Sequence, residues 1–102
     1  MSVTFLNADN FDTEVMQCAD RVLIDFYADW CGPCHMLSPV IEQVAEERAD
    51  IHVCKVNVDR APELAAQFGI TSIPALVVMD GGRIIRRSVG FMPKEDVLEL
   101  LK

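Results

Sequence analysis

One stretch decides the expected fold: VLIDFYADWCGPCH, from Val22 to His35. Residues 22–28 form an almost continuous apolar run, which is typical of a strand buried on both faces of a parallel sheet. Residues 36–48 carry apolar side chains at helical spacing. The two cysteines, Cys31 and Cys34, therefore lie where a strand ends and a helix begins.

This position favours thiol chemistry. A helix N-terminus offers unpaired N–H groups and a positive dipole end, and both stabilise a thiolate. We expect Cys31 at the exposed helix tip as the attacking thiolate and Cys34, inside the first turn, as the shielded partner. Gly32 leaves the Cys31 sulfur unobstructed. Pro33 suits a first helical turn and stiffens the loop.

Three other interpretations of the cysteine pair remain: a structural disulfide, half of a zinc site, or two inert thiols. A disulfide that closes so small a ring contributes roughly 2 kcal/mol at most. Zinc needs two more ligands at suitable spacing. No second Cys-x-x-Cys or His-x₃-His pair accompanies the remaining cysteines and histidines, which are Cys18, Cys54, His35 and His52. We therefore expect redox use and no metal.

The remaining chain reads as an α/β domain. The expected order of elements is βαβαβαββα, in which crossover helices imply parallel strands and a Gly81-Gly82 hairpin adds antiparallel ones. The expected strands are residues 3–6, 22–28, 51–58, 73–79 and 83–89. The expected helices are residues 8–18, 36–48, 62–68 and a last one opened by Pro93. The result is a five-stranded mixed sheet with four helices.

Length and charge narrow the function. The 102 residues suffice for one domain, 1–102, and the net charge of -7 argues against nucleic acid or an anionic membrane as partner. No apolar stretch approaches the roughly 20 residues of a membrane span. The first residues lack the pattern of a secretory signal, so we expect a cytoplasmic protein.

Three single residues stand out before any comparison. Asp25 is the one charge in an apolar strand, either buried or reaching solvent at the strand end. Lys55 lies in a β-rich run and is either a solvated edge lysine or a buried one. Trp30 directly precedes Cys31, which favours a docking surface over a core position.

The segment from Phe26 to Cys34 closely resembles the active site of the thioredoxin family. The resemblance extends over essentially the whole chain and includes Asp25, Pro39, and residues 55–59, 69–76 and 89–91. It implies the thioredoxin fold and protein-disulfide reductase activity. It also implies a redox-active Cys31–Cys34 disulfide with no bound cofactor. The implied partners are disulfide-containing proteins and a thioredoxin reductase, and we expect a monomer.

The resemblance also assigns roles. It implies that Asp25 exchanges a proton with Cys34, that Lys55 modulates Asp25, and that the Ile73–Pro74 bond is cis. A flat apolar docking patch is expected around Cys31, made of Trp30, Gly32, Pro33, Ile73, Pro74, Gly90 and Phe91. The chain departs from many relatives at Tyr27, where tryptophan is common, and at His35, where lysine or arginine is common. His35 is therefore expected to tune Cys31.

Two alternative functions remain open. A disulfide oxidant or isomerase uses the same chemistry in the opposite direction, but Gly32-Pro33 and the missing signal speak against it. A binding module would present the apolar patch without needing both cysteines.

Overall fold

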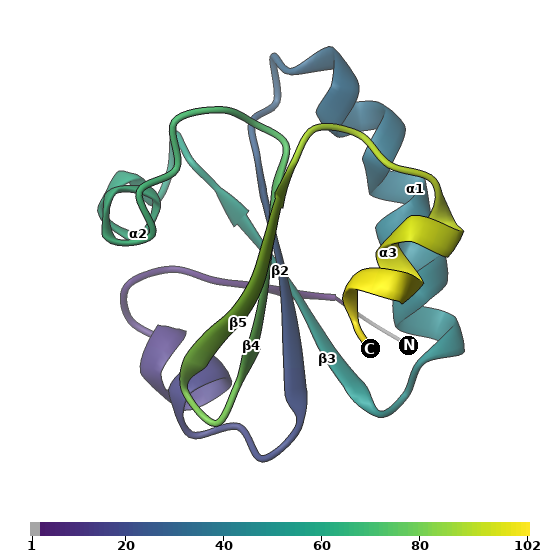
Figure 1. Cartoon of the computed structure of the whole chain (residues 1–102). Coiled ribbons are helices and arrows are strands. Elements are labelled where there is room, and N and C mark those ends of the chain that lie inside the picture. The colour runs from purple at the N-terminus through teal and green to yellow at the C-terminus, as the bar shows by residue number, and fades with distance from the viewer. Residues whose placement is uncertain (1–2) are drawn as a thin grey trace.

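The computed structural model describes residues 3–102 and forms one five-stranded mixed sheet with helices on both faces (Figure 1). Its strands are β1 (Thr4–Phe5), β2 (Arg21–Tyr27), β3 (Ile51–Asn57), β4 (Ala75–Asp80) and β5 (Arg83–Val89). Its helices are the short π-helix η1 (Asp12–Met16), α1 (Gly32–Glu47), α2 (Pro62–Gln67) and α3 (Lys94–Leu100). The expected five strands and four helices are confirmed.

The strands lie in the order β1-β3-β2-β4-β5. β3 runs parallel to both β1 and β2, whereas β4 is antiparallel to β2 and β5 is antiparallel to β4. The apolar run that begins at Val22 therefore supplies an interior strand, as its pattern predicts. In the parallel register of β2 and β3, Asp25 is the partner of Lys55.

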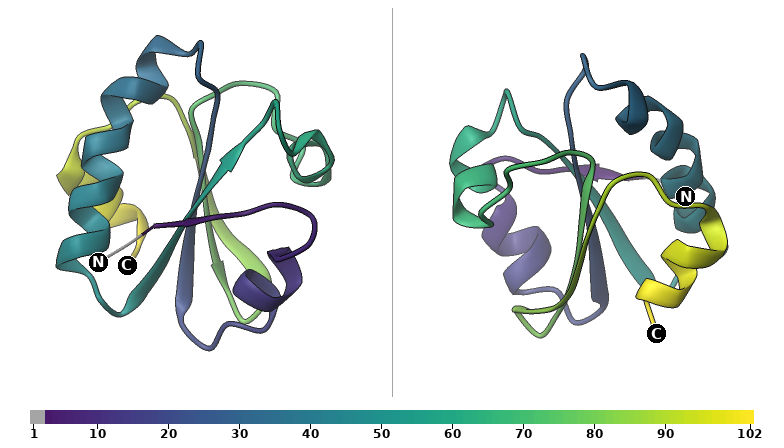
Figure 2. Two further views of the ribbon diagram at one scale, coloured as in Figure 1. Left: turned by 180° about the vertical axis from the view of Figure 1, so that it is seen from behind. Right: turned by 45° about the horizontal axis from the view of Figure 1, so that its top comes forward.

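The two faces of the sheet bury separate sets of side chains. α1 and α3 stay together on one face, and η1 and α2 lie on the other, in both views of Figure 2. Residues alternate across β2, so Leu23 packs toward α1 while Ile24 and Phe26 pack with the opposite cluster. The same alternation puts Asp25 on the α1 face. On the far face, the rings of Phe26 and Phe68 are 5.3 Å apart.

Two helix boundaries differ from the prediction. The first helix was expected over 8–18, but the Asn7 side chain accepts hydrogen bonds from the N–H groups of Asp9 and Asn10 and holds a turn there. Helical geometry follows only after that turn, in η1. α1, in contrast, begins at Gly32 rather than at residue 36, because Pro33 occupies its first turn and Cys31 caps it.

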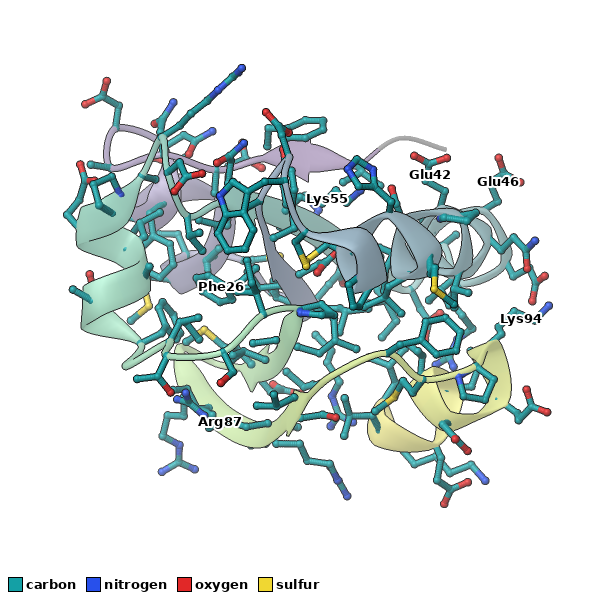
Figure 3. The ribbon with its side chains drawn as sticks, turned by 90° about the horizontal axis from the view of Figure 1, so that it is seen from above. Phe26, Glu42, Glu46, Lys55, Arg87 and Lys94 are labelled. Atoms are coloured by element: carbon teal, nitrogen blue, oxygen red, sulfur yellow. A yellow bond between two sulfur atoms is a disulfide. The ribbon has the colours of Figure 1, made fainter. Side chains whose placement is uncertain are left out.

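The second half of α1 presents acidic side chains on its outside. Figure 3 shows Glu42 and Glu46 projecting from its outer surface. Lys94 of α3 donates a hydrogen bond to Glu47 at 2.7 Å, which joins the ends of the two helices. Within residues 3–102, no helix is long and apolar enough to cross a membrane.

Candidate active site

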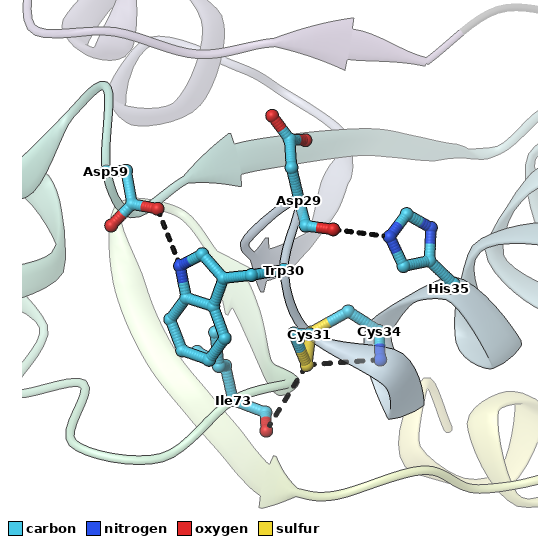
Figure 4. The surroundings of a disulfide bond; sticks show 7 residues. All are labelled: Asp29, Trp30, Cys31, Cys34, His35, Asp59 and Ile73. Atoms are coloured by element: carbon cyan, nitrogen blue, oxygen red, sulfur yellow. Dashed lines mark hydrogen bonds between the residues drawn. A yellow bond between two sulfur atoms is a disulfide. The ribbon is translucent and has the colours of Figure 1, made fainter.

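A disulfide joins Cys31 and Cys34 at the N-terminus of α1 (Figure 4). Their Cα atoms are 5.2 Å apart. Cys31 has extended backbone geometry and caps the helix, and its Sγ accepts a hydrogen bond of 3.2 Å from the N–H of Cys34. When the pair is reduced, this N–H and the helix dipole both stabilise negative charge on the Cys31 sulfur. The local geometry therefore favours Cys31 as the nucleophile.

Cys31 is less accessible than the sequence suggested. Its exposed fraction is 5%, although an exposed helix tip was expected. The side chain packs in a small cluster with Ala28 and Cys34, against the partly buried Tyr27 and Ile73. Ile73, in the loop before β4, therefore helps to bury Cys31.

Gly32, Pro33 and His35 are all exposed around the disulfide. Nε2 of His35 lies 2.6 Å from the carbonyl oxygen of Asp29. A carbonyl only accepts, so Nε2 carries the hydrogen of this bond. The histidine thereby links the first turn of α1 to the loop that precedes Cys31, a contact that the sequence did not reveal.

The loop before β4 supplies the opposite wall. The Ile73–Pro74 peptide bond is cis, and the Ile73 carbonyl oxygen lies 3.8 Å from Sγ of Cys31. Pro74 is buried and Ile73 is half-buried, so neither contributes a fully open surface to the patch expected around Cys31. Pro74 packs inward because it immediately precedes an interior strand. The N–H of Gly90 donates a 2.7 Å hydrogen bond to the Pro74 carbonyl, which brings the end of β5 to the site.

Trp30 is 71% exposed, and Phe91, which follows Gly90, is also exposed. The indole Nε1–H of Trp30 donates a 2.8 Å hydrogen bond to a carboxylate oxygen of Asp59 (Figure 4). This bond fixes an otherwise free aromatic ring. No local pattern indicated the role of Asp59, which follows β3 and lies 29 residues after Trp30 in the chain. Met36 of α1 is also an exposed apolar side chain, and the sequence did not indicate it as part of the site.

Asp25 and Lys55 are both buried, with exposed fractions of 1% and 6%. The solvated alternatives considered for each are therefore wrong. Neither carboxylate oxygen of Asp25 has a hydrogen-bond partner among the described residues. Burial raises the pKa of Asp25 to about 6, and the nearby positive charge of Lys55 opposes that rise. A carboxyl group with this pKa can both take and return a proton near neutral pH.

The other two cysteines lie away from the disulfide. Cys54 is buried in β3, and burial raises the pKa of its thiol to about 12. Cys18 is half-buried against the same core cluster. Across residues 3–102, no group of three or more histidine, cysteine or acidic side chains is arranged to hold a metal ion.

The cysteine pair, the buried Asp25 and the surrounding loops fit thiol–disulfide exchange. A dithiol at a helix N-terminus can donate two electrons to a disulfide, and a buried carboxyl group can manage the accompanying proton. The loop before β4, the start of the segment after β5 and Trp30 surround the sulfur with backbone and apolar groups. Such a site suits an extended polypeptide better than a small enclosed ligand.

Comparison with known proteins gives a consistent result. The family model described as Thioredoxin matches residues 2–102. A thioredoxin of Alicyclobacillus acidocaldarius subsp. acidocaldarius is 52% identical over 85 residues, which cover 82% of this chain and 81% of the relative. A thioredoxin of Chlorobaculum thiosulfatiphilum is 46% identical over 86 residues, covering 83% and 80%. One from Chlamydia muridarum is 39% identical over 99 residues, covering 97% and 95%.

Proposed function

Because the chain belongs to the thioredoxin family and is a protein-disulfide reductase, we propose that Cys31 attacks the target and that Cys34 resolves the intermediate. The observation that carries this division is the hydrogen bond from the Cys34 N–H to the Cys31 sulfur, at the N-terminus of α1. Among residues 3–102, the Cys34 sulfur accepts no such hydrogen bond. The bond to Cys31 therefore makes Cys31 the better nucleophile of the pair.

The reaction proceeds in two exchanges. The Cys31 thiolate attacks one sulfur of the target disulfide, which forms a mixed disulfide and releases the other target sulfur as a thiolate. Cys34 then gives its proton to Asp25 and attacks the Cys31 sulfur. This step forms the Cys31–Cys34 disulfide and releases the second target sulfur. Two electrons have passed to the target, and the protein is left oxidised.

The target approaches across the surface around the disulfide. The proposed docking surface consists of Trp30, Gly32 and Pro33, which flank Cys31 in the sequence, together with Ile73, Pro74, Gly90 and Phe91 from the loop before β4 and the end of β5. The backbone of Ile73 is next to Cys31, where it can pair with an extended target chain. Lys55 modulates Asp25, and His35 fixes the loop before Cys31. No bound cofactor takes part, because the cysteine pair itself carries the electrons.

A separate reductase must return the oxidised pair to the dithiol, and we propose a thioredoxin reductase as that partner. The single domain formed by residues 1–102 acts as a monomeric electron carrier in the reducing cytoplasm. The -7 net charge supports free diffusion without nucleic acid or membrane partners.

Replacement of each cysteine tests the division of roles. Cys34→Ser should abolish turnover of a protein disulfide such as insulin and should trap targets on Cys31, whereas Cys31→Ser should neither turn over nor trap. Cys18→Ser is the matched control, since this thiol lies outside the pair, and it should retain turnover. Trapping by Cys31→Ser instead of Cys34→Ser would reverse the assignment. A reduction potential well above the cytosolic glutathione range would indicate an oxidant.

A further inference from the structure

Ser38 is a polar residue of α1 that the reaction described above does not use. It is half-buried and lies one helical turn after Cys34, so the two side chains share a face of the helix. Both border a cavity of about 230 Å³ between α1 and the strands β2 and β3. Tyr27 and Lys55 line the same cavity. Ser38 is therefore close to the resolving cysteine in space as well as in sequence.

The hydroxyl of Ser38 binds the ammonium group of Lys55. Nζ of Lys55 donates a hydrogen bond of 2.6 Å to Ser38 Oγ. The same nitrogen lies 5.2 Å from the centre of the Tyr27 ring, within the range of a cation–π contact. A buried ammonium group needs such partners, because its loss of hydration is otherwise costly. Ser38 and Tyr27 provide them without adding a negative charge.

The usual partner of a buried ammonium group would be a carboxylate, and one is available. Asp25 lies opposite Lys55 in the β2–β3 register, is buried, and has neither oxygen hydrogen-bonded within the described part of the chain. The ammonium group nevertheless bonds to Ser38. Its direction is thus set by α1 and not by the charge across the strand pair.

We propose that Ser38 is a positioning residue that keeps the Lys55 ammonium group hydrogen-bonded to α1 and out of a direct ion pair with the Asp25 carboxylate. Asp25 then stays free to accept the Cys34 proton, a consequence that rests on the function proposed above. A direct ion pair with Lys55 would occupy the carboxylate and lower its affinity for that proton.

Few groups other than Lys55 are placed to change the pKa of Asp25. The titratable groups that border the cavity come from β2, β3 and α1, and they are Tyr27, Lys55, Cys34, His35 and Glu42. From β4, the residue opposite Asp25 is the apolar Leu76. Lys55 is the neighbouring charge that lowers the pKa of Asp25. By fixing the position of the Lys55 ammonium group, Ser38 controls how strongly that charge acts.

The test is the titration of the Asp25 carboxyl carbon by NMR in the oxidised protein, in which Cys31 and Cys34 do not titrate. Ser38→Ala should move the midpoint down by about one pH unit, since the released ammonium group turns to the unpartnered carboxylate. Ser38→Thr keeps a hydroxyl and should leave the midpoint in place. In a Lys55→Met background, Ser38→Ala should cause no shift. Thermal unfolding checks that each variant is folded.

The outcomes separate this inference from the proposed reaction. An unchanged or raised midpoint in Ser38→Ala would overturn the inference, because Lys55 would then not be restrained from Asp25. The same is true if the shift persists in the Lys55→Met background. If the midpoint falls as expected but Asp25→Asn resolves mixed disulfides at the normal rate, the positioning by Ser38 stands and the proton role of Asp25 fails.

Discussion

Asp25 and Lys55 are partners in the parallel register of β2 and β3 and are both buried, yet they form no hydrogen bond with each other. The ammonium group bonds to Ser38 of α1 instead. A buried carboxylate without a partner is energetically unfavourable, and its pKa of about 6 reflects that cost. This unfavourable burial of Asp25 is what makes the proposed proton transfer from Cys34 possible near neutral pH.

The first prediction concerns stability. The pKa of Asp25 rises from 3.8 in the unfolded chain to about 6 in the folded protein, so the folded state binds more protons between these values. Stability from this group is fully present below pH 4 and is lost as the pH rises through 6. At pH 7.5, Asp25→Asn should raise the free energy of unfolding by about 3 kcal/mol, from 1.36 kcal/mol per pKa unit.

Urea unfolding of the oxidised protein at pH 3.5 and pH 7.5 measures this effect. The gain should nearly vanish at the lower pH, where Asp25 is protonated in the folded protein and mostly protonated in the unfolded chain. Asp29→Asn, which changes an exposed carboxyl group in the neighbouring loop, is the control and should show little change at either pH. An equal gain at both pH values would assign the effect to packing and not to charge.

The second prediction concerns the resolving step. Asp25→Asn should slow the attack of Cys34 on a preformed mixed disulfide by about 100-fold near neutral pH, the lower end of the effect of a lost general base. The wild-type rate should rise as the pH increases through about 6, where Asp25 becomes able to accept a proton. Single-turnover mixing across pH 5 to 9 measures both. Identical profiles for the two proteins would exclude Asp25 as the proton acceptor.

A third prediction concerns the contact between Trp30 and Asp59. Asp59→Ala removes the acceptor for the indole N–H, so the ring gains freedom and docks substrate less well. KM for a protein disulfide should rise about fivefold with little change in kcat, as expected for the loss of one hydrogen bond of about 1 kcal/mol. Because Trp30 is the only tryptophan, its fluorescence anisotropy should fall as well.

Asp59→Asn retains an oxygen acceptor at the same position and should restore most of the anisotropy and the KM. If Asp59→Ala lowers kcat and leaves both KM and anisotropy unchanged, the carboxylate does not act through Trp30.

The fourth prediction concerns Gly90. Its φ angle is +97°, and its N–H donates to the Pro74 carbonyl. A Cβ there would meet open space, so backbone strain alone sets the effect of a substitution. Gly90→Ala should lower the free energy of unfolding by about 1 to 3 kcal/mol.

Gly32→Ala is the matched control for stability, because this glycine also faces open space but lies in the first turn of α1 without a positive φ angle. Urea unfolding should show a loss for Gly90→Ala and none for Gly32→Ala. Equal losses would mean that both glycines are needed for a reason other than φ.

Most of the sheet could be predicted from the sequence, because its strands and turns have characteristic local residue patterns. The apolar run of β2 predicts an interior strand, and the Gly81-Gly82 turn predicts the β4–β5 hairpin. The start of the first helix was predicted less well. Asn7 is a good N-cap residue, but its side chain stabilises a separate turn before η1, a competition that spacing alone does not resolve.

Some residues of the candidate site could likewise be predicted from the sequence and others could not. The cysteine pair, Asp25 and the exposed Trp30 could be recognised because each is an unusual residue in its local pattern. Asp59 and Ser38 could not, since each is an ordinary polar residue whose role depends on a partner far away in the chain.

The sequence by itself therefore determined the dithiol, its place between a strand and a helix, and the family. Tertiary structure decided how accessible Cys31 is, where Lys55 points, and what holds Trp30. The physical reason is that local patterns report the burial and backbone preference of each residue, whereas a hydrogen bond such as Lys55 to Ser38 depends on how α1 packs across β3. That packing is a property of the whole sheet and its helices.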